Sequence, residues 1–526
     1  MKKNRAIIST ILILSIVIST FGVVAAAPAP KSQGVLTYAT FSDPLCLIPF
    51  MHADSASSDV CDMLYAALLE YDKNLNLSPL VAEAMPTISA DGKTITFKIK
   101  KGVLWHDGVE MTSADVKFTY DLIRDPAVNS PRMSDFEIIS KIDTPDKYTA
   151  VFTLKSPSGV LLDAFQNAYI VPKHLFEKED KTKLKSSKYA REPVGNGPFK
   201  FVEWKNNERI TLERFDKYFD GKPGFDKYIF DINPSQATAM VKAEKGEANR
   251  VFIPESDVAR MSKLSNLNVN RYVGNVFDCI LWNTKTPFFS DKKVRQAMTH
   301  AINKQAIVSG IYKGNGKPAV GSVVPALPFY NKNAKDYKYN IATAKKLLDE
   351  AGWKVGKDGI IEKNGKKFKI TMLTNKGNIM REKMLVEVQR QLKQVGVQVE
   401  PRIVEWNTFI TQYLETGNFD AYVGGFSTGL DADHRAFYYS DPAVGVLNRG
   451  SYNNPAADKI MDEIVVTTDM KKQKELMFKL QEMVAEDQPM TFIIYRTQAT
   501  ALNKNVKNSE FYDLLGWFNS DKCWVE

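Results

Sequence analysis

Residues 104–120, LWHDGVEMTSADVKFTY, constrain the local fold more than any other stretch of the chain. They follow residues 94–100 (TITFKIK), whose period of two is typical of a half-buried strand. Asp107-Gly108 predicts a turn, and Thr112 with Asp115 three residues later predicts a helix N-cap with an acid in the first turn. We therefore expect a strand, a turn and a capped helix in immediate succession.

The rest of the chain predicts an α/β fold with more than one domain. At 526 residues it is too long for one ordinary hydrophobic core. The first half is rich in strand patterns, whereas the second half alternates helical and strand patterns, with Gly352 and Gly396 as helix stops. Such alternation is typical of an α/β architecture.

The charge pattern excludes one class of partner. The net charge is +9, and lysines and acids are interspersed along the chain. No basic helix is interleaved with aromatic residues, so we expect a solvated surface and no nucleic-acid partner.

The N-terminus predicts export. Lys2, Lys3 and Arg5 precede an uncharged apolar run, residues 6–24, and three alanines follow it. This pattern predicts a signal peptide over residues 1–26; the alternative is that the run is retained as a membrane anchor. No cysteine lies in or just after the run, so the lipid-anchoring signal is absent. We expect an exported protein, periplasmic or on the extracellular cell surface.

The four cysteines, Cys46, Cys61, Cys279 and Cys523, lack any CxxC spacing, which argues against metal or redox chemistry. Export permits disulfides, and four cysteines allow three pairings. Cys46–Cys61 is the most plausible bridge, and free buried thiols are the alternative.

The sequence contains no recognisable catalytic constellation. His106-Asp107 has no nucleophile or third partner at a useful spacing, so a turn is the better interpretation. Residues 431–434, Asp-Ala-Asp-His, contain side chains that could bind a metal ion, but a solvated loop is the favoured interpretation. We expect no enzymatic activity, no metal and no cofactor.

Five motifs occur in a fixed order. They are residues 104–120, VGNGPF at 194–199, NTKTPFFSDKKVRQAMTHAINK at 283–304, ATAKKLLDEAGW at 342–353 and YNNPAADKIMDE at 452–463. In sequence and order they resemble the extracytoplasmic solute-binding proteins of ABC importers, in the family of peptide, dipeptide and nickel binders called solute-binding protein family 5. The resemblance is greatest to oligopeptide-binding proteins.

This resemblance implies a two-lobed, periplasmic-binding-protein-like clamshell of type II with an extra accessory domain. Lobe I would comprise residues 27–77, 195–283 and 492–526, and lobe II residues 284–491. The accessory domain, residues 78–194, would be inserted in lobe I, with its residues 106–107 away from the cleft. Two hinge crossings near residues 282–283 and 492–495 would let the lobes close on a ligand. We expect a monomer.

The resemblance also implies ligand contacts. Residues 420–433, DAYVGGFSTGLDAD, resemble the family's strand whose backbone pairs with an extended ligand. Backbone groups would come from Gly425, Phe426 and Ser427 in lobe II and from the loop between Ser42 and Cys46 in lobe I. Aromatic contacts would come from Trp406, from Trp282 at the first crossing and from Tyr495 at the second, with core packing as the alternative for each aromatic residue.

The loop after this strand departs from the family pattern. Peptide binders of known specificity carry an aspartate there that pairs with the α-ammonium of the ligand, but this chain has Thr428 and Gly429. A hydroxyl does not offset a desolvated ammonium. Either Asp431 or Asp433 replaces the missing acid, or the ligand lacks a free amino terminus.

The leading hypothesis is a protein that delivers an oligopeptide or other small solute to the transmembrane subunits of an ABC permease. An oligosaccharide bound on aromatic platforms such as Trp406 is the alternative within the same fold. A secreted hydrolase has less support because no nucleophile–base pair is present. A signalling or adhesion receptor would require the N-terminal segment to be retained as an anchor.

Overall fold

The computed structural model describes residues 34–526, so the predicted signal peptide lies outside the described residues. Within this range no helix combines the length and apolarity needed to span a bilayer.

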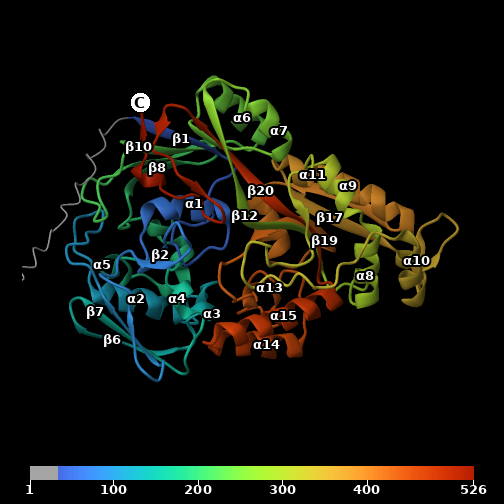
Figure 1. Cartoon of the computed structure of the whole chain (residues 1–526), viewed down its shortest axis with the longest axis horizontal. Helices are drawn as coiled ribbons and strands as arrows, with labels where there is room; N and C mark the ends of the chain where they lie inside the picture. Colours follow the sequence, from blue (N-terminus) through green and yellow to red (C-terminus); the bar gives the residue numbers. More distant parts are fainter. Residues whose placement is uncertain (1–33) are drawn as a thin grey trace, which may run out of the picture.

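One large mixed sheet passes through the whole molecule (Figure 1). In spatial order its strands are β18 (Gln398–Val404), β17 (Lys369–Asn375), β19 (Ala421–Ser427), β12 (Leu267–Trp282), β20 (Met490–Asn503), β11 (Arg250–Phe252), β1 (Val35–Thr40), β10 (Lys227–Ile232), β9 (Arg209–Arg214) and β8 (Phe199–Lys205). The short strand β13 (Lys317–Pro318) pairs with β20.

The two long strands β12 and β20 join the lobes. Residues 267–273 of β12 pair with 497–503 of β20, on the side where β20 also pairs with β11 of lobe I. Residues 277–281 pair with 490–495, where β12 also pairs with β19 of lobe II. The register shifts between Val273 and Phe277. The expected crossing at Trp282–Asn283 lies at the end of β12, within lobe II, and not where the strand passes between the lobes. We therefore propose that the hinge lies at the register shift.

Lobe II is built in three layers around its part of the sheet. Helices on one face are α8 (Lys292–Ala301), α9 (Lys304–Gly310), α10 (Ile341–Glu350) and α11 (Ile379–Leu392); on the other lie α13 (Arg435–Tyr438), α14 (Pro455–Val466) and α15 (Met470–Asp487). Ile280 of β12 packs in the first core, whereas Cys279 and Leu281 pack in the second. This alternation is what a strand buried on both faces requires. The α/β prediction is confirmed.

The accessory domain contains residues 104–120. Its four-stranded sheet is β4 (Thr87–Ile88), β5 (Thr94–Lys98), β7 (Thr149–Leu154) and β6 (Ile139–Asp146), covered by α2 (Ser113–Arg124), α3 (Met133–Phe136), α4 (Leu161–Ala164) and α5 (Lys173–Phe176). Thr112 and Asp115 form the predicted capping box at the start of α2, and Trp105 is fully buried. The predicted strand, turn and capped helix are confirmed.

A charged cluster holds the junction between the lobes. The carboxylate of Asp278 in β12 is 1% exposed and accepts a hydrogen bond of 2.8 Å from the Tyr312 hydroxyl. Arg496 of β20 lies 3.1 Å from it and Arg381 of α11 lies 3.5 Å from it. The single negative charge of Asp278 thus faces the positive charges of two guanidinium groups. The cluster lies next to the register shift between β12 and β20.

The four cysteines are all buried and free, so the expected Cys46–Cys61 bridge is not formed. Burial raises the pKa of the Cys46 thiol to about 11 and also raises that of Cys61. These thiols therefore pack as small, uncharged apolar groups.

Replacing Asp278 with asparagine removes the only negative charge of the cluster while keeping its shape. Because two buried guanidinium groups then lose their counter-charge, we expect the free energy of unfolding to fall by about 3–5 kcal/mol. Urea denaturation followed by tryptophan fluorescence measures this. Asp349→Asn, which breaks an exposed ion pair with Lys354, should cost less than about 1 kcal/mol. Equal stability of the two variants would contradict a structural role for Asp278.

Candidate functional site

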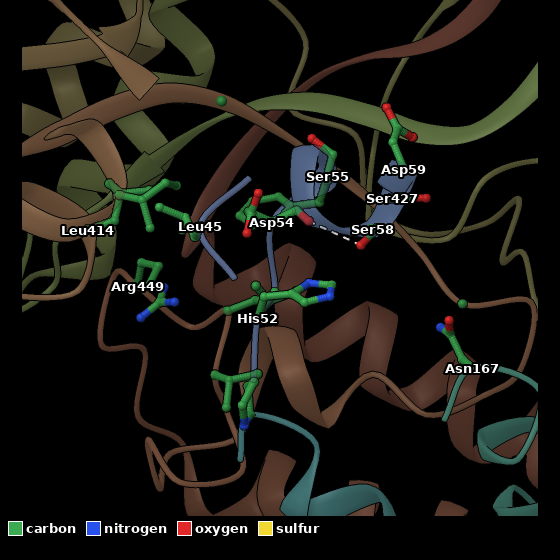
Figure 2. A pocket seen from close by; sticks show the side chains of 18 of the residues that line it. Leu45, His52, Asp54, Ser55, Ser58, Asp59, Asn167, Leu414, Ser427 and Arg449 are labelled. Carbon is green, nitrogen blue, oxygen red and sulfur yellow. Dashed lines mark hydrogen bonds between the residues drawn. The ribbon is translucent and has the colours of Figure 1, made fainter. Parts of the chain in front are cut away.

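A cavity of about 1160 Å³ lies between lobe I, lobe II and the accessory domain. Its walls come from the loop before α1 (Ser55–Leu64) and α1 itself, from three accessory-domain segments, from β19 and the residues after it, from the turn after α12 (Trp406–Thr408), and from the loop between α13 and α14. Figure 2 shows side chains from several of these elements converging on it. Residues 106–107 do not line the cavity, whereas other parts of the accessory domain do. These are residues 129–131, 166, 167, 169 and 185.

One edge of β19 is open toward the cavity. Along its length β19 pairs with β12, but it pairs with β17 only at Ala421 and Tyr422. The Thr428 N–H donates to the Asn275 carbonyl at 2.9 Å, and antiparallel pairs alternate in direction. The backbone groups of Gly425 and Ser427 therefore point away from β12, toward the edge where residues 424–427 line the cavity.

Glycine is required at position 425 because β19 runs directly over the charged cluster. A Cβ there would lie 2.1 Å from Asp278 Oδ1 and 2.7 Å from Arg381 Nη2. The open edge is thus positioned by the same carboxylate that joins the lobes.

The structure brings six of the predicted site residues to the cavity wall. These are Cys46, Trp406, Gly425, Phe426, Ser427 and Thr428. The Trp406 ring packs edge-on against Phe41 of lobe I, with centroids 5.4 Å apart, and its Nε1 has no hydrogen-bond partner among the described residues. Trp406 is therefore both a wall of the cavity and a contact between the lobes.

Three other predicted contacts lie elsewhere. Trp282 is fully buried in lobe II, where its Nε1 donates to Thr491 Oγ1 at 3.1 Å. The Tyr495 hydroxyl accepts hydrogen bonds from the N–H groups of residues 320 and 321. Ser42 donates to the carbonyl of Asp43. None of the three lines the cavity. The structure does not bring Trp282, Tyr495 and Ser42 to the cavity, because core packing and local hydrogen bonds use these side chains.

Asp431 and Asp433 do not line the cavity either, which corrects the prediction of an anchor on this loop. Asp433 pairs with Arg435 at 2.7 Å. Asp431 accepts from the Asp433 N–H, and burial together with the charge of Asp433 raises the pKa of Asp431 well above its usual value. Both carboxyls thus have partners within their own loop and lie outside the cavity lining.

Arg435 connects lobe II to the accessory domain. Its side chain is 6% exposed, and it reaches Glu137 at 3.2 Å and the Ser134 carbonyl at 3.2 Å. Nearby, the Gly159 N–H donates to the Val465 carbonyl at 2.9 Å. The lobes are therefore in contact around the cavity, with Asp433 holding Arg435 in place.

Sequence reasoning missed the acids that do line the cavity. Asp59 and Asp62 are three residues apart on α1, on the side opposite the buried Val60 and Leu64. Two acids three residues apart on a capped helix predict one acidic helix face, and this was the signal in the sequence that could have found them. The Tyr169 hydroxyl donates to Asp62 at 2.7 Å. Loss of hydration within the cavity raises the pKa of Asp62 to about 7; the Tyr169 hydrogen bond opposes this and the charge of Asp59 adds to it.

His106 is half-buried and His434 is buried, and both lie within hydrogen-bond distance of neighbouring groups of the protein. His106 Nε2 lies 3.1 Å from the Gly197 carbonyl, and burial lowers its pKa to about 4. His434 Nδ1 lies 3.0 Å from Ser322 Oγ, and burial lowers its pKa to about 4 as well. Across residues 34–526, no three His, Cys, Asp or Glu side chains gather in a way that would hold a metal ion.

Comparison with known proteins places the chain among binding proteins. The family model described as bacterial extracellular solute-binding proteins, family 5 Middle, matches residues 76–445. The oligopeptide-binding protein AppA of Bacillus subtilis (strain 168) is 34% identical over 508 residues, which cover 95% of this chain and 93% of that protein.

Solved structures agree with this result. The structure of Bacillus subtilis AppA in complex with a nonapeptide matches with a TM-score of 0.91 and 33% identity, covering 94% of this chain and 100% of that one. NikZ from Campylobacter jejuni in complex with Ni(L-His) matches with a TM-score of 0.85 and 25% identity, over 93% of this chain and 99% of that one.

Gly425→Ala tests the close approach of β19 to Asp278. Because the added methyl group overlaps a buried carboxylate, we expect the free energy of unfolding to fall by about 1–3 kcal/mol in urea denaturation. Gly321→Ala is the matched control, since nothing lies within 4 Å of the added Cβ, and should change stability by less than about 0.5 kcal/mol. A Gly425→Ala variant as stable as this control would show that the strand has room to shift.

Proposed function

Because the chain belongs to family 5 of the bacterial extracellular solute-binding proteins, we propose that it captures an oligopeptide in the cavity between its lobes and delivers it to the transmembrane subunits of an ABC permease. The observation that carries this proposal is the open edge of β19. A strand edge offers an extended peptide the N–H and C=O partners that its own backbone needs.

The size of the cavity supports an extended ligand. Its volume of about 1160 Å³ is above the range of about 300–1,000 Å³ that is typical for small-molecule sites. Side chains of a peptide bound along β19 would alternate between opposite walls. An oligosaccharide would leave the open backbone groups of Gly425 and Ser427 without such a regular partner, so that alternative has less support.

The acids of α1 offer an anionic part of the site to the cationic end of a ligand. Asp59 and Asp62 take the role that we expected from Asp431 or Asp433, but from lobe I. A free amino terminus placed near Asp62 would have a carboxylate partner within the cavity. Ligand binding would therefore engage β19 of lobe II and α1 of lobe I together.

The remaining parts of the proposal concern the protein as a whole. It acts as an exported monomer whose residues 1–26 are removed, with no lipid-anchor cysteine and no catalytic step. Residues 78–194 act as an accessory domain inserted in lobe I. The register shift at residues 273–277 supports a hinge there, and ligand would favour the closed arrangement of the lobes.

Ligand that is retained during purification tests this function. We expect mass spectrometry of the denatured, freshly purified protein to release peptides of several residues. After the ligand is removed, small-angle scattering should show a smaller radius of gyration when a defined nonapeptide is added. If only non-peptide solutes are released and no defined peptide binds, the proposed function is wrong.

The pKa of Asp62 predicts how peptide affinity depends on pH. Asp62 attracts an ammonium only when it is ionised, and its pKa is about 7, so affinity for a free-amine peptide should fall as pH decreases below about 7. Titration calorimetry between pH 5 and 8 measures this, with a slope of at most about tenfold per pH unit.

The matched variants are Asp62→Asn and Asp431→Asn. Asp62→Asn should weaken binding of the free-amine peptide at pH 8 and flatten the pH profile, and it should change little for the N-acetylated peptide. Asp431→Asn should behave as the parent does, because Asp431 lies outside the cavity. An unaltered pH profile in Asp62→Asn would rule out this carboxylate as the ammonium partner.

A further inference from the structure

Arg449 is a charged cavity residue that the site described above does not use. It lies in the loop between α13 and α14, is half-buried, and lines the cavity. Figure 2 shows it below Leu45 and Leu414, beside His52. Within residues 34–526 no side chain forms a hydrogen bond or ion pair with its guanidinium, and this includes Glu415, which also lines the cavity. A guanidinium that lines a ligand cavity without a protein partner is free to pair with an acidic group of the ligand.

The backbone on both sides of Arg449 is fixed. The Asn448 amide donates to the carbonyls of Tyr439 at 3.0 Å and Tyr452 at 2.7 Å. The Gly450 carbonyl accepts from both the N–H and the hydroxyl of Thr284, at 2.8 and 2.9 Å. A Cβ at position 450 would lie 2.5 Å from the Trp282 carbonyl. The backbone that carries Arg449 is therefore held in place at the edge of the cavity.

A second donor nearby also lacks a partner. The Tyr422 side chain is 2% exposed and lines the cavity, and its hydroxyl has no hydrogen-bond partner among the described residues. Leaving such a buried hydroxyl unpaired costs about 1–3 kcal/mol. The charge of Arg449 reaches it: that charge lowers the pKa of Tyr422, although burial dominates and raises it overall.

The acids of the cavity are not placed to neutralise Arg449. In Figure 2 Asp54 lies between Arg449 and Asp59. The Asp54 carboxylate already accepts hydrogen bonds from the N–H and the hydroxyl of Ser57, at 3.0 and 2.7 Å. Asp62 lies on the same helix as Asp59 and is bound by Tyr169. The acids of α1 and of the loop before it thus have hydrogen-bond partners of their own, and none of them is paired with Arg449.

We propose that Arg449 and Tyr422 form a subsite that binds a carboxylate of the ligand. A guanidinium donates two parallel N–H groups to a carboxylate, and the tyrosine hydroxyl supplies one further O–H donor. The carboxylate is either an Asp or Glu side chain or the C-terminus of the peptide. This inference rests on the proposed function, since it takes the ligand to be a peptide.

The experiment is a scan with defined peptides, measured by titration calorimetry. The set consists of alanine–serine nonapeptides with one Glu at each position in turn, each matched by a Gln peptide, and of the Gln peptides with a free or an amidated C-terminus. We expect one Glu position, or the free C-terminus, to bind at least about tenfold more tightly than its neutral counterpart. Which of the two shows the preference identifies the source of the carboxylate.

Three variants assign the preference to the subsite. Arg449→Gln should reduce it to less than about twofold, and Tyr422→Phe, which removes only the hydroxyl, should reduce it by about threefold or more. Arg402→Gln, an exposed arginine outside the cavity, should keep the parent preference. Circular dichroism confirms that each variant is folded.

The outcomes separate the two proposals. Peptides that bind the parent with no preference for a carboxylate overturn the subsite and leave the peptide-binding function intact. A preference that survives in Arg449→Gln also overturns the subsite. Failure of every peptide to bind the parent overturns the proposed function, and the subsite with it.

Discussion

The buried carboxylate of Asp278 is the interaction on which the rest of the structure depends. It lies where β12 and β20 pass from one lobe to the other, and it balances Arg381 and Arg496. It also lies so close to β19 that residue 425 must be glycine. One carboxylate therefore positions both the junction of the lobes and the open edge of β19. A substitution at either place should alter the packing at the other.

The sequence predicted those parts of the fold that local interactions decide. The capping box of Thr112 and Asp115 depends on residues three positions apart, and the turn before it depends on a glycine. The open-edge residues Gly425 and Ser427 were also predicted, through the family resemblance. In each case the relevant pattern is contained in one short stretch of chain.

The errors came from decisions that the tertiary structure makes. An indole at the end of a strand gives the same pattern whether it faces a cavity or a core, and Trp282 is in the core because Thr491 of β20 binds its Nε1. Likewise, Asp433 was one of two candidates for the acid that pairs with the ligand, but its carboxylate pairs with Arg435. Asp59 and Asp62 were missed because a helix face becomes a cavity wall only when distant segments are brought opposite to it.

The contact that Arg435 makes with Glu137 and Ser134 has a kinetic consequence. It lies beside α3 and α14, on the side of the molecule away from the long stretch of β12 and β20 in Figure 1. In the proposed cycle the lobes must part to release the ligand, so this contact between lobe II and the accessory domain would enter the dissociation rate and not the encounter rate. Residence time is thereby set partly by residues that never touch the cargo, which lets a permease that loosens this contact release the cargo without competing for the cavity itself.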